Sequence, residues 1–596
     1  MPKKHKRVQK TVKYFFRILR IIHSGSLKWT LTNYAVSLIK GFIPLIVIWL
    51  LKLLVDEVIS IVKSPDVELS FSLILYIVLT AFAYLVGITT NLLAKITSSK
   101  LVRQVSEKMY ALLHKATSSI PFSILEKGHY FDMIYRASRE VGHRPATIVN
   151  SMIQVLQFGL SLFAMVFVLL NYHWSVIFVV LLAIAPLLLV KLVQAKKTFQ
   201  WRNEKTSEER EMNYYHRILT EPVFAKELRI FGFASVFEKR FSRLNRAYSK
   251  KEDKRIVRYV LWETIASVFS LIVLFAFMLF IVADAIGGEI SLGLMLMIIM
   301  ALNRGMAFAQ NLARSISDLY ENSLFISNFF RVIDQKYNTA QVNDSISLND
   351  SIRMKDVSFS YDEKRVLNKV NLQIPKGKTI AVVGENGAGK STLVKLLCKL
   401  YVPADGEIYF DSVQLSAIDS SVVQASVSAI MQDFLLYNLS VQENVGISNL
   451  NSMDRTRIKE ILRSTGLEKT ISELPDGIDS LLGNLFENSS ELSIGEWQKM
   501  ALARALYKEA EFYIFDEPTS ALDGLAETQI IDMFFKATEG KTKLIISHKL
   551  TTVLRADYIY VMKQGEIVEQ GTHQSLVEMN GEYYKLFTSR TRLLNF

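Results

Sequence analysis

Six long apolar stretches occur in the first half of the chain, and polar segments separate them. A helix needs about 20 mainly apolar residues to cross the hydrocarbon core of a bilayer. Six stretches meet this requirement, at about 31-54, 71-94, 150-171, 175-195, 261-284 and 290-312. The pattern therefore predicts a transmembrane domain of six α-helices over residues 31-320.

The connections between these stretches differ in charge. Residues 95-147 carry nine Lys and Arg and residues 195-260 carry 17, whereas the other three connections are short and carry few charges. Basic loops stay on the cytoplasmic side of a membrane. We therefore expect a multi-pass protein of the cytoplasmic (inner) cell membrane, with both large loops and both termini in the cytoplasm.

Both basic loops contain helix-forming residues with apolar positions three and four apart, so the helices are expected to continue below the bilayer. Each loop has a break, at IPFSILEKGHYFDMIY in the first and at LTEPVFAKELRIFGF in the second. A short transverse helix at each break would suit contact with a soluble domain. An ordinary solvated loop is the alternative.

Composition and charge narrow the class of protein. Half of the residues are hydrophobic, and the net charge is +13. Such a charge can indicate nucleic-acid binding, but basic cytoplasmic loops between membrane spans give the same total, so we expect a lipid bilayer and no nucleic acid as partner. Residues 1-30 form a basic, amphipathic segment without the features of a secretory signal, which predicts a helix on the membrane surface. Cys398 is the only cysteine, which excludes an internal disulfide.

Two cations lie inside the predicted spans, where an ionisable side chain is costly unless it faces a cavity, pairs or reaches the interface. Arg304 stands beside Asn303 and is followed by Gln310. Its pattern is equally compatible with lining a transport pathway and with structural pairing. For Lys40 we favour a structural role.

The long apolar runs stop at about residue 336, and a linker over 321-350 and a second domain over 351-596 are predicted. In this domain the apolar run TIAVV leads into GENGAGKST, Gly384 to Thr392, and then into LVKLLCKLY. A strand, a loop and a helix in this order are the context of a P-loop. Its glycines let backbone amides face phosphates, Lys390 contacts the β and γ phosphates, and Ser391 ligates Mg²⁺. The second domain is therefore expected to be an α/β nucleotide-binding domain.

A further strand pattern, EFYIFDEPTSALD, ends in two acids. Asp516 is expected in the magnesium shell, and Glu517 is expected to polarise a water for in-line attack on the γ-phosphate. An acidic pair at a strand end can also cap the next helix, but the preceding P-loop favours the catalytic interpretation.

The segment ELSIGEWQKMALARAL, residues 491-506, resembles the signature of the ABC transporter family, and the whole chain resembles an exporter-type half-transporter. The resemblance implies that Tyr361 stacks on adenine and that His548 is the switch histidine. The residues implied to bind ATP are Tyr361, Gly384, Glu385, Asn386, Gly387, Ala388, Gly389, Lys390, Ser391, Thr392, Ser493, Gly495 and Asp523. Those implied in catalysis are Glu517, His548 and Gln432, and those in Mg²⁺ binding are Ser391, Gln432 and Asp516.

The resemblance also implies a second half-transporter as partner, because two such domains close head to tail over ATP. Ser493 and Gly495 would then contact the γ-phosphate held by the other chain. The signature reads LSIGE, so Ile494 replaces a glycine, and a β-branched residue does not readily adopt a positive φ or allow close backbone approach to phosphate. Asn488 and Ser489 also stand where relatives often have glycines. We favour a homodimer; a heterodimer in which the altered signature serves a less active site is the alternative.

The similarity to bacterial lantibiotic, peptide and multidrug exporters favours ATP-driven export of a peptide or an amphipathic small molecule by alternating access. A lipid or lipid-linked flippase is the alternative. An ATP-gated channel or a regulatory ABC protein is a further possibility.

Overall fold

A computed structural model describes residue 14 and residues 16–24, 27–63, 70–170, 172–335, 347–517 and 524–591. Contacts within the chain divide it into two compact units. The membrane unit comprises residues 1–120 and 125–336, and the C-terminal unit comprises residues 121–124 and 337–596.

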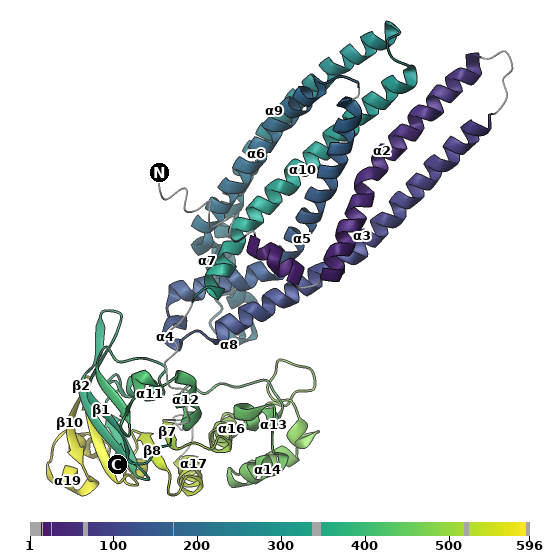
Figure 1. Ribbon diagram of the computed structural model, residues 1–596. Helices are drawn as coiled ribbons and strands as arrows, with labels where there is room; N and C mark the ends of the chain where they lie inside the picture. The colour runs from purple at the N-terminus through teal and green to yellow at the C-terminus, as the bar shows by residue number, and fades with distance from the viewer. Residues whose placement is uncertain are drawn as a thin grey trace. The chain divides into compact units, whose positions relative to one another are not determined.

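Six long apolar helices build the membrane unit and confirm the six predicted spans (Figure 1). Between 11 and 39 % of the spanning part of each helix is buried, and many apolar side chains of α3 and α9 are exposed, as a lipid environment allows. The six helices are α2 (Leu27–Lys63), α3 (Phe71–Ser118), α5 (Gly128–Leu170), α6 (Val176–Glu204), α9 (Ala234–Ile286) and α10 (Leu292–Ile333).

A short helix lies at each of the two breaks in the basic loops. In the first loop, α4 (Phe122–Leu125) stands between α3 and α5. In the second, α7 (Thr206–Thr220) is followed by α8 (Pro222–Ile230) and then by α9. Pro222 forces this interruption, because the residue before a proline avoids helical geometry and Glu221 is extended, with φ −85° and ψ 138°.

Small and polar residues hold the membrane helices against one another. A Cβ at Gly41 of α2 would lie 3.0 Å from Cβ of Leu160, so a larger residue would push α5 away. The buried Ser161 hydroxyl donates to the Gly41 carbonyl at 3.0 Å, and the buried Ser270 hydroxyl of α9 donates to the Ala183 carbonyl of α6 at 2.6 Å. Such contacts stabilise helix pairs in lipid, where apolar burial alone gives little.

The boundaries differ from the predicted ones at two places. Helix α10 continues to Ile333, so residues 321–333 of the predicted linker are helical. In the basic segment 1-30, residues 16–24 are helical and bury Ile18 and Ile22, while residues 1–13 lie outside the described part.

Two sheets form the C-terminal unit. The first has six strands in the order β10-β9-β3-β8-β7-β6, and the second has four antiparallel strands in the order β2-β1-β4-β5. The strands are β1 (Ser351–Tyr361), β2 (Lys364–Pro375), β3 (Thr379–Gly384), β4 (Asp405–Phe410), β5 (Val413–Gln414), β6 (Val427–Ile430), β7 (Phe512–Asp516), β8 (Thr542–Ile546), β9 (Tyr558–Lys563) and β10 (Glu566–Gly571).

Helices surround the six-stranded sheet, and Figure 1 shows α13, α14 and α16 together at the end of the unit away from β1 and β2. The helices are α11 (Lys390–Leu397), α12 (Ser420–Ser426), α13 (Val441–Val445), α14 (Arg455–Ser464), α15 (Glu468–Ser472), α16 (Ile494–Tyr507), α17 (Gly524–Ala537), α18 (Leu550–Val553), α19 (His573–Glu578) and α20 (Glu582–Thr591). Strands β3, β7 and β8 are buried along their whole length, which explains their continuous apolar sequence runs. The fold is thus the predicted one, with six membrane helices followed by an α/β domain.

Cys398 follows α11 and is buried in the core between the two sheets. Burial raises the pKa of its thiol to about 12, so almost no reactive thiolate exists near neutral pH. We expect the folded chain to resist a thiol reagent such as DTNB at pH 8 and to release close to one equivalent of product per chain after denaturation. Rapid reaction of the native chain would contradict this placement.

Candidate nucleotide site

The candidate site forms where four parallel strands end. Strand β3 pairs in parallel with β8, β8 with β7, and β7 with β6. Their carboxyl ends therefore lie along one edge of the sheet, the edge at which open α/β sheets bind ligands. Residues that follow these four ends, 385–391, 431–432, 517 and 547–548, are thus brought together from distant parts of the sequence.

The turn after β3 depends on residues without a side chain. Gly384 and Gly389 have φ of +155° and +104°. A Cβ at Gly384 would lie 2.2 Å from the carbonyl oxygen of Met562, and a Cβ at Gly389 would lie 2.6 Å from Cδ2 of Leu367. The turn therefore requires glycine at both positions, for conformation and for space. It continues into the N-terminus of α11, where backbone N–H groups can bind phosphate.

Lys390 is the first residue of α11 and is 7 % exposed. Its Nζ donates to the carbonyl oxygens of Gly384 and Glu385, both at 2.9 Å, so the ammonium group is folded back over the turn. Burial lowers the pKa of Lys390, while the nearby carboxylates of Glu517 and Asp516 oppose that shift. A partly desolvated cation at this place is suited to bind an anion of high charge.

Asp516 ends β7 and is 4 % exposed. Burial raises the pKa of its carboxyl to about 6, with the charge of Glu517 adding to the shift, although Asp516 accepts a hydrogen bond from Ser391. The carboxylates of Asp516 and Glu517 lie together with little access to solvent. Among the described cations, Lys390 is the one that lowers the pKa of Asp516, so the negative charge is only partly compensated. The local field therefore favours a cation beside Asp516 and Ser391.

Glu517 and His548 form a pair next to this position. Nε2 of His548 lies 3.0 Å from Oε1 of Glu517, and both side chains are about four-fifths buried. Glu517 has φ +40°, an unfavourable conformation for a non-glycine residue, and its N–H donates to the Ile546 carbonyl at 3.2 Å. Backbone strain of this kind concentrates at functional sites because it aims a side chain. Here it aims the Glu517 carboxylate towards the same space as Lys390.

A cavity of about 300 Å³ gathers most of the predicted residues. Its lining is Val366, Asn386, Gly387, Gly389, Lys390, Ser391, Thr392, Gln432, Asp516, Glu517 and His548. Val366 was missed by the sequence analysis, since it belongs to β2 and no local motif marks it. Among the described residues, no group of three or more His, Cys, Asp and Glu side chains could hold a metal alone. Mg²⁺, which commonly binds through one or two carboxylates and phosphate oxygens, therefore fits Asp516 and Ser391 only together with a nucleotide.

Other predicted residues lie outside this lining. Tyr361 packs edge-on against Phe359 and Tyr401, with ring centroids 4.9 and 5.3 Å away, and Thr392 Oγ1 donates to its hydroxyl at 3.5 Å. Glu385 is exposed and Ala388 is buried in the core beneath the turn. Asp523 lies outside the described residues.

The signature residues also lie outside the cavity lining, at the N-terminus of α16. Ser493 caps this helix, because its Oγ accepts the Glu496 N–H at 3.4 Å and Oε2 of Glu496 accepts the Ser493 N–H at 2.8 Å. The Ser493 hydroxyl also donates to the same Oε2 at 2.7 Å. Ile494 is the first helical residue and is 52 % exposed, and its φ is not positive. This position therefore does not require a positive φ, because the capping box gives it ordinary helical geometry. Asn488 instead has the positive φ, +63°.

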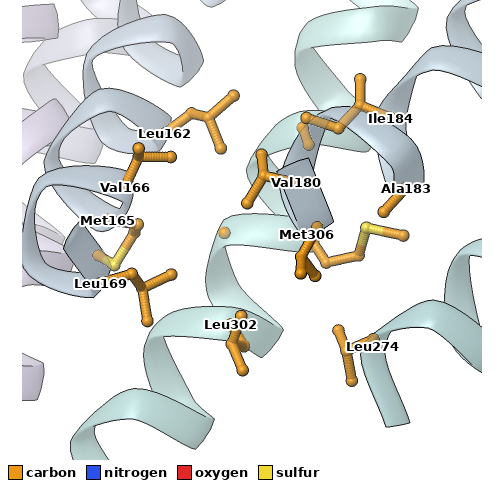
Figure 2. A pocket seen from close by; sticks show the side chains of 13 residues that line it. Leu162, Met165, Val166, Leu169, Val180, Ala183, Ile184, Leu274, Leu302 and Met306 are labelled. Carbon is orange, nitrogen blue, oxygen red and sulfur yellow. The ribbon is translucent and has the colours of Figure 1, made fainter. Parts of the chain in front are cut away.

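The membrane unit has a separate, apolar cavity among α5, α6, α9 and α10, and Figure 2 shows Leu162, Val166, Val180, Leu302 and Met306 around it. Its volume is about 20 Å³, too small for a transported molecule, and its apolar lining gives a water no partners. Arg304 and Asn303 are exposed, whereas Gly305 and Met306 line the cavity, so the polar residues of α10 point elsewhere. Lys40 is half-buried.

The free-energy cost of burying the Asp516 carboxylate predicts an effect on the free energy of unfolding. In the unfolded chain its pKa is about 3.9, and the folded value is about 6. The folded state therefore binds more protons between these values and loses stability as the pH rises. Replacing Asp516 by Asn should stabilise the nucleotide-free, Mg²⁺-free protein by on the order of 3 kcal/mol at pH 8 and about half as much at pH 5.

Thermal or denaturant unfolding of the full chain, followed at both pH values, measures this difference. Asp476→Asn changes the same functional group at an exposed position of the same unit and serves as the control. Destabilisation by Asp516→Asn at pH 8, or a gain that is larger at pH 5, would contradict the assignment.

Comparisons with known proteins agree with this geometry. Residues 367–520 match the family described as ABC transporter. The nisin transport ATP-binding protein NisT of Lactococcus lactis subsp. lactis is 28 % identical over 96 % of this chain and 95 % of its own. The ATP-dependent lipid A-core flippase of Alcanivorax borkumensis is 28 % identical over 74 % of this chain and 75 % of its own.

The solved structure of a bacterial Atm1-family ABC exporter with ATP bound shares the fold. The TM-score is 0.77 at 22 % identity, and the match covers 94 % of this chain and 99 % of that chain. The matched domain, the six membrane helices and the full-length relatives lead to one conclusion. Residues 367–520 form an ABC transporter domain, and the chain is similar over nearly its whole length to a half-transporter of the exporter type.

Proposed function

We propose that this chain forms half of an exporter that uses ATP hydrolysis to move a peptide or an amphipathic small molecule across a bacterial cytoplasmic membrane by alternating access. One observation carries the proposal. A single cavity gathers Lys390, Ser391, Asp516, Glu517 and His548 in a chain that also has six membrane helices. ATP-driven transport couples a nucleotide site to membrane helices, and this chain carries both features.

The chain's own groups divide the work of hydrolysis. Lys390 and the amides of the P-loop would hold the β and γ phosphates of ATP. Glu517 would accept a hydrogen bond from the attacking water and orient it, and His548, 3.0 Å away, would hold that carboxylate in position. Ser391, Asp516 and Gln432 would hold Mg²⁺, which supplies charge stabilisation at the phosphates when bound.

A second chain is part of the proposal, because Ser493 and Gly495 do not line the cavity that holds Lys390. Ser493 and Ile494 are exposed at a helix N-terminus, where they could meet phosphates held by another copy. Helix α8 and the residue after it expose Val223, Ile230 and Phe231 to 84 %, 77 % and 69 %, which suits a contact surface better than a solvated loop. We favour two copies of this chain.

Similarity supports a peptide as cargo, because the match to the nisin transport protein spans nearly the whole of both chains. The lipid A-core flippase, which matches over about three-quarters of its length, makes lipid transport the second candidate. Reconstituted vesicles with outward-facing nucleotide domains distinguish them. We expect ATP-dependent uptake of an amphipathic peptide, with Arg304→Ala reducing it through loss of a polar group on the transport pathway. Lipid movement without peptide uptake would favour the flippase.

Glu517→Gln tests the hydrolytic role directly. The amide keeps the size of the side chain but is a poor acceptor for the proton of the attacking water, so ATP turnover should fall at least about a hundredfold while ATP binding persists. Phosphate release and ATP binding by the purified variant are the measurements, and Glu511→Gln, before β7, is the control. Near-normal turnover by Glu517→Gln would contradict the assigned role.

Substitutions of Ile494 test whether its side chain limits ATP turnover. Its exposed, β-branched side chain at the first helical position would obstruct close approach of this backbone to phosphate. We expect Ile494→Gly and Ile494→Ala to raise ATP turnover several-fold over the unmodified chain, whereas Val568→Ala, which removes a similarly exposed apolar group on β10, should leave it unchanged. Unchanged or lower turnover for both Ile494 variants would contradict the obstruction.

A further inference from the structure

Two lysines from different helices flank one tryptophan ring at the start of the first span. Nζ of Lys100 on α3 lies 4.4 Å from the ring centre of Trp29, and Nζ of Lys28 on α2 lies 5.5 Å from it. The two ammonium groups are thus at most about 10 Å apart, which is close to the Debye length of about 8 Å in physiological salt. Two ammonium groups held this close favour the binding of an anion between them.

Buried hydrogen bonds fix this arrangement. Asn33, one turn after Trp29, donates from Nδ2 to the Trp29 carbonyl at 2.8 Å and accepts from Thr97 Oγ1 of α3 at 3.0 Å. Asn33 and Thr97 are 1 % and 4 % exposed. This contact sets the register of α2 against α3 and places Trp29 opposite the turn that carries Lys100. The cluster is therefore built into the fold of the membrane unit.

No acidic residue in the described part of the chain neutralises the positive charge of the cluster. Lys28 and Lys100 are both exposed. Within the described ranges, neither has an acidic side chain at ion-pair distance, and the acid closest to Lys100 along α3, Glu107, pairs with Arg103. A partner that carries negative charge would complement this surface.

Apolar side chains lead from the span directly to the two lysines. Leu92, Ile96 and Lys100 are four residues apart on α3 and so share one face of the helix. Leu92 and Ile96 are 55 % and 53 % exposed, and Leu31, three residues after Lys28 on α2, is 55 % exposed. An apolar face that ends in cations and a tryptophan matches a phospholipid, with its acyl chain on the apolar face and its phosphate at the membrane boundary.

We propose that Lys28, Trp29 and Lys100 bind the headgroup phosphate of an anionic phospholipid of the cytoplasmic leaflet, whose acyl chain lies along Leu31, Leu92 and Ile96. The site belongs to the membrane unit and the nucleotide cavity to the C-terminal unit. The proposal does not depend on ATP hydrolysis or on the nature of the transported molecule. A bound lipid would brace the start of α2 against α3.

Native mass spectrometry of the detergent-solubilised full chain can test this site. Phosphatidylglycerol and phosphatidylcholine with identical acyl chains are titrated separately. The unmodified chain should bind phosphatidylglycerol more tightly. Each lysine near an anionic lipid contributes about fivefold in affinity, so Lys28→Gln/Lys100→Gln should weaken phosphatidylglycerol binding by roughly twenty-five-fold. Lys28→Arg/Lys100→Arg should retain it.

Lys239→Gln/Lys250→Gln removes the same charge from two exposed positions of α9 and should bind as the unmodified chain does. Equal unfolding temperatures of the four proteins establish that the variants are folded, and the Arg pair supplies the comparison if the Gln pair is unstable. The proposal is overturned if the Gln pair keeps the preference for phosphatidylglycerol, if the α9 control loses it equally, or if glycerol phosphate displaces the lipid at equal concentration.

Discussion

The parallel pairing of β3, β8, β7 and β6 is the constraint on which the nucleotide site depends. It sets the carboxyl ends of four strands side by side, so groups as distant along the chain as Asn386 and His548 meet in one cavity. The backbone adopts unusual conformations at that edge, which leave space for a ligand. Glycines occupy the turn after β3, and Glu517 accepts a strained φ after β7. Both departures serve the approach of a phosphate.

Without a ligand, the burial of charged groups at this site costs free energy. The pKa of Asp516 is raised and that of Lys390 is lowered, each mainly by burial. A nucleotide with Mg²⁺ supplies the opposite charges for both groups. Binding can therefore stabilise the ligand-bound state strongly, which is what a conformational cycle driven by ATP requires.

Most of this architecture could be predicted from the sequence because its signals are local. Apolar length revealed the spans, and the order of strand, glycine loop and helix revealed the P-loop. Other features depend on the tertiary structure. Val366 reaches the cavity through sheet pairing, and the capping box between Ser493 and Glu496 gives Ile494 an ordinary backbone. The orientation of Arg304 away from the apolar cavity follows from how α10 packs, and Trp29 meets Lys100 only because Asn33 and Thr97 align two helices.

The central claim is that one chain supplies only part of a hydrolytic site and that a second copy completes it. ATP hydrolysis by the purified chain, measured over a dilution series in detergent alongside sedimentation, tests this most directly. We predict that the rate per chain falls towards zero as dimers dissociate. A rate per chain that stays constant where only monomers sediment, or no hydrolysis at any concentration without a different half-transporter, would contradict the account.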